Sequence, residues 1–209
     1  MSASKMSGRA AVAARRGSRA RLLRIIGGAW RGRKLRFPAS ADIRPTPDRV
    51  RETLFNWLGA RVRGARALDL FAGSGALGLE ALSRGASHVT FVERDAAAAQ
   101  ELRARLTDWG AVDVLVARAD ALHYLAGEAQ PFDLVFLDPP FATDLLHEAA
   151  RLLEERQWLA DGALIYVECP SRAGPPVLPE GWRMLKAKQA GEVGYHLLAH
   201  AGAPGSNTQ

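Results

Sequence analysis

The chain has 209 residues, a formal net charge of +6 and one cysteine, Cys169, a length that suits one domain with a packed core. One cysteine excludes an internal disulfide and a cysteine-based metal cluster, and it fits a reducing compartment such as the cytoplasm. No stretch approaches about eighteen consecutive apolar residues, so we expect no transmembrane span.

The positive charge is concentrated at the start of the chain. Residues 1–36 contain eleven Lys or Arg and no acid, whereas the remaining 173 residues contain 17 basic and 22 acidic side chains. A polyanion is the natural partner of such a segment. Residues 1–20 lack apolar periodicity and are predicted to be a disordered basic tail, although an Arg- and Ser-rich start without acids also fits an organelle transit peptide.

Residues 21–45 are predicted to form a basic, hairpin-like extension. Leu22 to Phe37 contain two short β-type runs interrupted by glycines. Basic side chains interleaved with an aromatic ring are typical of RNA contacts, in which the charges meet phosphates and the ring stacks on a base. A solvated basic surface is the alternative. The candidate RNA-binding residues here are Arg24, Trp30, Arg31, Arg33, Lys34 and Arg36.

A helix is predicted to begin within the stretch IRPTPDRVRETLFNWL. Thr46 is a suitable N-cap, and Pro47 suits the first helical position. Arg44, Arg49 and Arg51 can face a cleft and, with Thr46, complete the candidate RNA-binding set. Four apolar residues recur at helical spacing and are expected in the core: Val50, Leu54, Trp57 and Leu58.

Beyond Gly64, strand-like and helix-like segments alternate, which is typical of a parallel sheet covered on both faces. The predicted strands are 66–71, 88–93, 112–117, 132–137, 163–168, 182–188 and 193–200. The predicted helices are 76–84, 96–109, 119–126 and 143–159. Asp161 and Gly162 should form a turn, and the last two strands should be an antiparallel pair. Residues 46–201 are therefore predicted to be one α/β domain, followed by a loose tail at 202–209.

A glycine loop follows the first strand of this domain. Gly73, Gly75 and Gly78 match the GxGxxG fingerprint, and Glu93 lies at the end of the next strand, where an acid binds ribose hydroxyls. The fingerprint alone does not choose the cofactor. Asp69, at the end of the first strand, would repel a pyrophosphate and attract the ammonium of a methionine moiety. These acids favour S-adenosylmethionine over a dinucleotide, and Asp120 at the end of the third strand can contact its adenine amino group.

A second motif ends the predicted strand 132–137, whose run FDLVFL suits a strand buried on both faces. Asp138 and the Pro139 carbonyl present two acceptors on a stiff turn, and Phe141 adds a flat ring. This combination fits a planar ring with an exocyclic amine. A strand end stopped by prolines is the simpler interpretation.

Together these motifs resemble the Rossmann-like methyltransferases that modify exocyclic amines of bases. More narrowly, RIIGGAWRGRKL, RPTPDRVRETLFNWL, LDLFAGSGALGLEALSRGA, FDLVFLDPPF and the WLADGALIYVE run resemble the bacterial RsmD family of small-subunit rRNA guanine-N2 methyltransferases. The resemblance covers about residues 22–200. It implies a class I methyltransferase with a seven-stranded, mostly parallel sheet whose last strand is antiparallel.

The resemblance also implies the roles of individual residues. Direct in-line transfer to a guanine N2 amine would require no metal, and a monomer is expected to act on 16S rRNA or a 30S assembly particle. S-adenosylmethionine would be held by Asp69, Phe71, Gly73, Ser74, Gly75, Glu93, Arg94, Asp120 and Ala121. The target guanine would be held by Asp138, Pro139, Pro140 and Phe141.

Three other functions remain open at this point. An adenine-N6 methyltransferase would use the same turn, and only the modified base separates it from a guanine enzyme. A nicotinamide-dependent dehydrogenase is disfavoured by Asp69. A non-catalytic RNA-binding or ribosome-assembly protein is disfavoured by the complete set of acids and the DPPF turn. Cys169 lies away from that turn, which disfavours a cysteine nucleophile.

Overall fold

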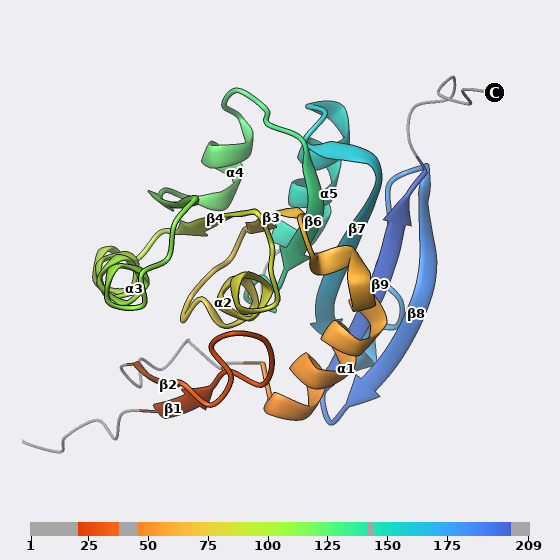
Figure 1. Ribbon diagram of the computed structural model, residues 1–209. Coiled ribbons are helices and arrows are strands. Elements are labelled where there is room, and N and C mark those ends of the chain that lie inside the picture. Colours follow the sequence, from red (N-terminus) through yellow and green to blue (C-terminus); the bar gives the residue numbers. More distant parts are fainter. Residues whose placement is uncertain (1–20, 38–45, 142–143, 202–209) are drawn as a thin grey trace, which may run out of the picture.

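The computed structural model describes residues 21–37, 46–141 and 144–201. Seven strands form one mixed sheet in the order β5-β4-β3-β6-β7-β9-β8 (Figure 1). They are β3 Arg66–Asp69, β4 His88–Glu93, β5 Val114–Arg118, β6 Phe132–Leu137, β7 Leu159–Pro170, β8 Trp182–Ala190 and β9 Val193–His200. Strands β3 to β7 are parallel, whereas β9 is antiparallel to both β7 and β8. The predicted α/β class and the antiparallel final pair are confirmed.

Alternate residues of the central strands are buried on opposite faces, which explains their continuous apolar runs. In β6, Leu134 and Phe136 pack against one face, while Val135 and Leu137 pack against the other. The first face is covered by α1 Asp48–Leu58, α2 Ala76–Ser83 and α3 Ala96–Asp108, and the second by α4 Ala121–Leu125 and α5 Leu145–Glu155 (Figure 1). The 3₁₀ turns are η1 Gly59–Val62 and η2 Ser171–Ala173.

Two local predictions are wrong. Helix α1 begins at Asp48 after Pro47, and its start has no side-chain cap, because the Thr46 hydroxyl is directed elsewhere. Asp161 and Gly162 do not precede β7 but lie inside it, where the pairing register jumps from Phe132–Leu159 to Leu134–Leu164. Arg61 donates to the Gly162 carbonyl across this bulge, at 2.7 Å, which gives the irregular segment a partner outside the sheet.

The basic extension folds back onto α2. Its strands β1 Arg21–Arg24 and β2 Lys34–Phe37 form the predicted antiparallel hairpin. The Ile26 and Gly27 amides donate to the two carboxylate oxygens of Glu80, at 2.9 and 2.8 Å. Gly28 has φ +76, and a Cβ there would lie 1.8 Å from the Ser83 carbonyl oxygen, so this close contact requires glycine. The extension is therefore attached to the α/β domain through defined contacts with α2.

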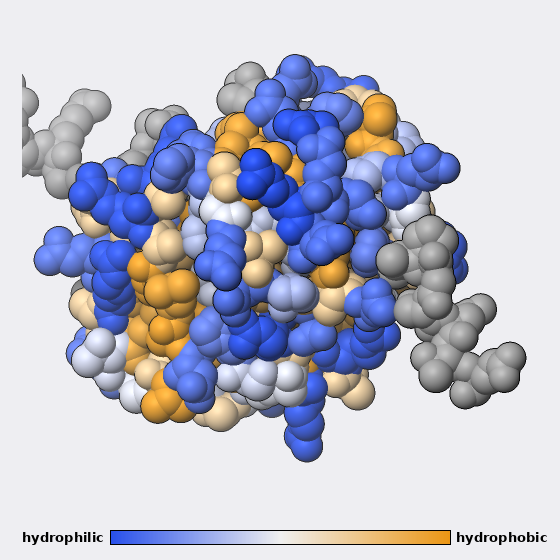
Figure 2. Space-filling model, turned by 90° about the horizontal axis from the view of Figure 1, so that it is seen from above, coloured by the Kyte–Doolittle hydropathy of each residue, from blue (hydrophilic) through white to orange (hydrophobic). Residues whose placement is uncertain are grey.

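No helix of the described residues is long and apolar enough to cross a membrane. Figure 2 views the molecule from above, over α4 and α5, and shows hydrophobic residues in groups separated by hydrophilic ones.

Candidate active site

The carboxyl ends of the parallel strands meet at one edge of the sheet, and acids follow or end four of them. Asp69 ends β3, Glu93 ends β4, Asp138 follows β6 and Glu168 lies near the end of β7. All four line a cavity of about 700 Å³. Ligands of open α/β sheets bind at this edge. The structure thus brings together residues that are up to a hundred positions apart in the chain.

The glycine loop between β3 and α2 is braced by two of these acids. Asp69 accepts a hydrogen bond from the Gly78 amide at 2.9 Å, and Glu93 accepts one from the Gly73 amide at 2.7 Å. A Cβ on Gly78 would lie 2.2 Å from the Phe91 ring, so this glycine lets α2 pack closely on β4. The acids therefore shape the loop and also present carboxylate oxygens to the cavity.

Asp69 is almost fully buried, and burial raises the pKa of its carboxyl to about 7. The Gly78 amide opposes the shift, and the negative charge of Glu93 adds to it. A cation bound beside Asp69 would favour the ionised carboxylate.

The predicted cofactor residues border the cavity with one exception. Asp69, Phe71, Gly73, Ser74, Glu93, Arg94, Asp120 and Ala121 line it. Gly75 is not among the lining residues; it forms the left-handed N-cap of α2. Asp120 caps α4, because its Oδ1 accepts from the Leu122 and His123 amides at 3.0 and 3.3 Å. Glu101 and Arg105 of α3 also line the cavity and were not predicted.

The DPPF turn follows β6, the strand that pairs with β3, and it borders the same cavity as the glycine loop. Asp138, Pro139, Pro140 and Phe141 all line it, and the Phe141 side chain is 43% exposed. An exposed aromatic ring at a cavity is available for stacking. The Asp138 carboxyl has a pKa raised well above its usual value, first by burial and then by the charges of Glu168 and Asp69.

Sequence reasoning missed Glu168, although its position near the end of an apolar run was the signal used for the other acids. Its side chain is 3% exposed and accepts hydrogen bonds from the Tyr166 hydroxyl at 2.8 Å and the Thr46 hydroxyl at 3.0 Å. Thr46, which was grouped with the RNA-binding residues, is buried at the cavity and contacts Asp138 as well, at 3.5 Å. Among the described residues, no group of three or more His, Cys, Asp or Glu side chains is arranged to hold a metal ion.

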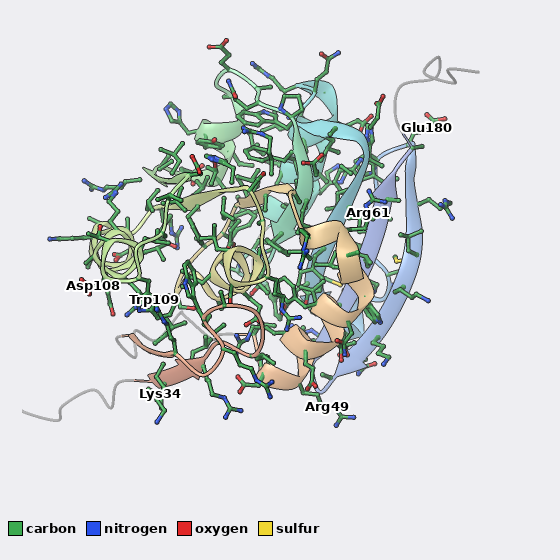
Figure 3. The ribbon with its side chains drawn as sticks, viewed as in Figure 1. Lys34, Arg49, Arg61, Asp108, Trp109 and Glu180 are labelled. Atoms are coloured by element: carbon green, nitrogen blue, oxygen red, sulfur yellow. The ribbon has the colours of Figure 1, made fainter. Side chains whose placement is uncertain are left out.

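The predicted RNA-binding residues do not share one environment. Arg24, Arg31, Lys34 and Arg49 are exposed, and Lys34 and Arg49 point outward from the same side of the molecule (Figure 3). Arg33 is also exposed, but its guanidinium lies over the rings of Trp30 and Trp109, 5.9 and 5.2 Å from their centroids. The Arg36 side chain and the whole of Arg44 lie outside the described residues.

The prediction that Arg51 faces a cleft and binds RNA is wrong. Its side chain is fully buried between α1 and α2, where it pairs with Glu80 at 3.5 Å and Asp48 at 2.6 Å. It also donates to the Arg24 and Thr46 carbonyls. A buried guanidinium with these partners joins the extension to the domain and is not available to a phosphate.

The loop of the extension lies at the far end of α2 from the cavity. Helix α2 begins after Gly75 at the glycine loop and ends at Ser83, whose carbonyl and hydroxyl accept from the Ala29 and Trp30 amides. An RNA that reached both places would extend along at least the length of this helix, about 12 Å for its eight residues.

The sheet order, the glycine loop and the DPPF turn at one edge define a class I, Rossmann-like S-adenosylmethionine-dependent methyltransferase. The model of the family described as "Conserved hypothetical protein 95" matches residues 23–199. The Escherichia coli (strain K12) protein "Ribosomal RNA small subunit methyltransferase D" is 51% identical over 84% of this chain and 88% of its own length. The protein of the same name from Haemophilus influenzae is 48% identical over 84% and 92%.

A solved structure of an Escherichia coli protein is 48% identical, covers 87% of this chain and 99% of its own, and superposes with a TM-score of 0.80. The chain belongs to the ribosomal RNA small subunit methyltransferase D family, as the resemblance in its motifs indicates.

Proposed function

We propose that this protein transfers a methyl group from S-adenosylmethionine to the exocyclic N2 amine of a guanine in small-subunit ribosomal RNA. The observation that carries the proposal is the shared cavity, which is lined both by the DPPF turn and by the glycine loop with its acids. Membership of the ribosomal RNA methyltransferase family supports an rRNA substrate. Such a substrate would place the reaction in the cytoplasm, where the protein would act as a monomer on rRNA or on an assembling small subunit.

The acidic side chains that line the cavity fit S-adenosylmethionine. The Asp69 carboxylate suits the ammonium group, the Glu93 carboxylate suits the ribose hydroxyls, and the Asp120 carboxylate suits the adenine amine. The same acids would repel a pyrophosphate, which argues against a nicotinamide dinucleotide. Bound S-adenosylmethionine supplies a sulfonium methyl group that is electrophilic without help from a metal.

The DPPF turn supplies the other half of the reaction. The lone pair of the guanine amine is delocalised into the ring, so the amine is a poor nucleophile. Hydrogen bonds to Asp138 and to the Pro139 carbonyl would favour a pyramidal nitrogen whose lone pair points at the methyl group, while Phe141 stacks on the base. Holding the reactants in near-attack geometry supplies much of the rate.

We expect the affinity for S-adenosylmethionine to depend on pH through Asp69. The folded carboxyl has a pKa of about 7, so it is protonated below that pH and ionised above it. Because the ligand ammonium prefers the ionised carboxylate, affinity should fall when the pH is lowered from 8 to 6. The loss should be less than the roughly tenfold loss of ionised carboxylate, because the ligand amine, with an ordinary pKa of about 8, gains its proton over the same range. Calorimetric titration measures this directly, with Asp69→Asn as a variant whose affinity should vary less. Tight binding of NAD with none of S-adenosylmethionine would overturn the cofactor assignment.

The exposed charges of the extension should set the affinity for RNA without changing the chemical step. Neutralising Arg31 and Lys34 to glutamine should flatten the salt dependence of RNA binding by about two units of slope, because each lost phosphate contact removes about one unit. The matched control is Arg151→Gln with Arg156→Gln, two exposed charges of the α5 region on the other face of the sheet. Equal slopes for the two double variants would show that the extension is not the RNA surface.

Mass-spectrometric mapping of small-subunit rRNA from cells that lack this protein tests the function itself. Loss of one N2-methylguanine, restored by the wild-type gene, is the expected result. Loss of an N6-methyladenine would instead identify an adenine enzyme with the same turn. Unchanged rRNA would favour an assembly protein without catalytic activity.

A further inference from the structure

A line of hydrogen-bonded side chains runs from the DPPF turn into the interior. Thr46 connects the Asp138 carboxyl, at 3.5 Å, to the Glu168 carboxyl, at 3.0 Å. The Tyr166 hydroxyl donates to the same oxygen of Glu168, at 2.8 Å. Thr46, Glu168 and Tyr166 are 5%, 3% and 0% exposed. Asp138 is therefore the member of the line that is most open to a substrate, and Glu168 lies behind it.

The neighbours of Asp138 are mostly acidic or neutral. The Tyr166 hydroxyl donates to Glu168, and the single hydrogen of the Thr46 hydroxyl can be donated to Glu168 or to Asp138. These hydrogen bonds oppose the burial that raises the pKa of Glu168. The buried guanidinium of Arg51 approaches this site only through the Thr46 carbonyl, and its ion pairs go to Glu80 and Asp48. The titratable groups that act on the Asp138 carboxyl are Asp69 of β3 and Tyr166 and Glu168 of β7. One step further out, Glu93 of β4 acts on Asp69, Tyr195 of β9 acts on Tyr166, and Arg51 of α1 donates to the Thr46 carbonyl.

We propose that Glu168 is a positioning residue that acts on Asp138 across the Thr46 hydroxyl and makes Asp138 a stronger proton acceptor for the guanine amine. This inference rests on the proposed function. A buried carboxylate next to Asp138 raises its proton affinity, whereas the bridging hydroxyl keeps the ionised form accessible. A base is most effective when its pKa lies near the working pH, and the bound sulfonium charge would lower the raised pKa of Asp138 toward that range.

The proton and electrons balance in this scheme. The nitrogen lone pair forms the new bond to the methyl carbon, and the carbon–sulfur bond breaks with its electron pair remaining on sulfur. The nitrogen gains positive charge as that bond forms, and Asp138 takes one of its protons. The proton then leaves through the open cavity to water, so each methyl transfer releases one proton.

Two substitutions should move the pH profile in opposite directions. Glu168→Gln removes the negative neighbour, so the pKa of Asp138 falls and the acid limb of the rate profile moves to lower pH. The plateau rate should fall by about tenfold, because a weaker base supplies less of the roughly 100- to 10,000-fold that such catalysis contributes. Thr46→Val removes the hydroxyl whose donation to the ionised Asp138 carboxylate lowers the Asp138 pKa, so the acid limb should move to higher pH. Thr46→Ser should restore the wild-type profile.

The measurement is single-turnover methyl transfer to small-subunit rRNA or particles from pH 5.5 to 9, roughly spanning the working range of a neutral base. S-adenosylmethionine is kept saturating at every pH, so that the titration of Asp69 does not enter the rate. Thermal unfolding of each variant shows whether it folds, and if Glu168→Gln does not, the Thr46→Val and Thr46→Ser pair carries the test.

Opposite shifts for Glu168→Gln and Thr46→Val support the inference. If both variants are folded and follow the wild-type pH profile, Glu168 has only a structural role and the inference fails, while the proposed function stands. If the wild-type protein methylates no guanine amine in small-subunit rRNA, the proposed function itself has failed.

Discussion

Replacing Asp138 with alanine should lower the single-turnover rate of methyl transfer by about 100-fold or more. The substitution removes one of the two acceptors that would orient the amine, and it leaves the Pro139 carbonyl alone to hold the nitrogen. The glycine loop follows β3 and Glu93 ends β4, so the groups expected to hold S-adenosylmethionine stay in place and its affinity should change little. Asp138→Asn keeps one carbonyl acceptor and should fall between alanine and the wild type.

The rate is measured on small-subunit particles, with cofactor affinity determined by calorimetry on the same preparations. Asp108→Ala is the matched control, because Asp108 is an exposed acid at the end of α3, far out on the molecule (Figure 3). Wild-type rates for Asp138→Ala would show that the DPPF turn does not hold the amine.

Replacing Glu80 with glutamine should lower the free energy of unfolding by about 3–5 kcal/mol, because it leaves a buried cation without its buried partner. Glu80 is 0% exposed and accepts from two amides of the extension as well as from Arg51 and Arg84. The amide side chain has one acceptor oxygen and no charge, so it cannot satisfy these four donors. The extension should also separate from α2.

Urea unfolding measures the loss of stability, and proteolysis within residues 21–37 reports release of the extension. Glu155→Gln serves as the control, since its pairing with Arg151 is exposed on both sides and such pairs contribute only about 0–1 kcal/mol. A loss for Glu80→Gln no larger than that of the control would contradict the role of Glu80 as the anchor of the extension.

Local segments of the candidate site were predictable because each motif acts within a short stretch of chain. The glycine loop requires left-handed backbone at Gly73 and Gly75, and these positions have φ of 50° and 76°. Asp138 and Phe141 reach the cavity because the prolines between them fix the strand end. Strand and helix positions followed from apolar periodicity, and this periodicity also predicted the parallel sheet whose carboxyl ends bring the two motifs together.

The burial of Arg51 and the roles of Thr46 and Glu168 depended on tertiary structure alone. Arg51 resembled the neighbouring surface arginines in the sequence, and only packing against α2 placed Glu80, 29 positions away, beside its guanidinium. Threonine is a common N-cap residue, which is why Thr46 was predicted to cap the helix. Its hydroxyl instead donates to the Glu168 carboxylate, 122 positions away. Local sequence determines backbone conformation over a few residues, whereas the partner of a buried polar group is set by which elements pack together. The sequence by itself therefore determined the fold class and the two motifs of the site, and the tertiary structure decided how their acids are coupled.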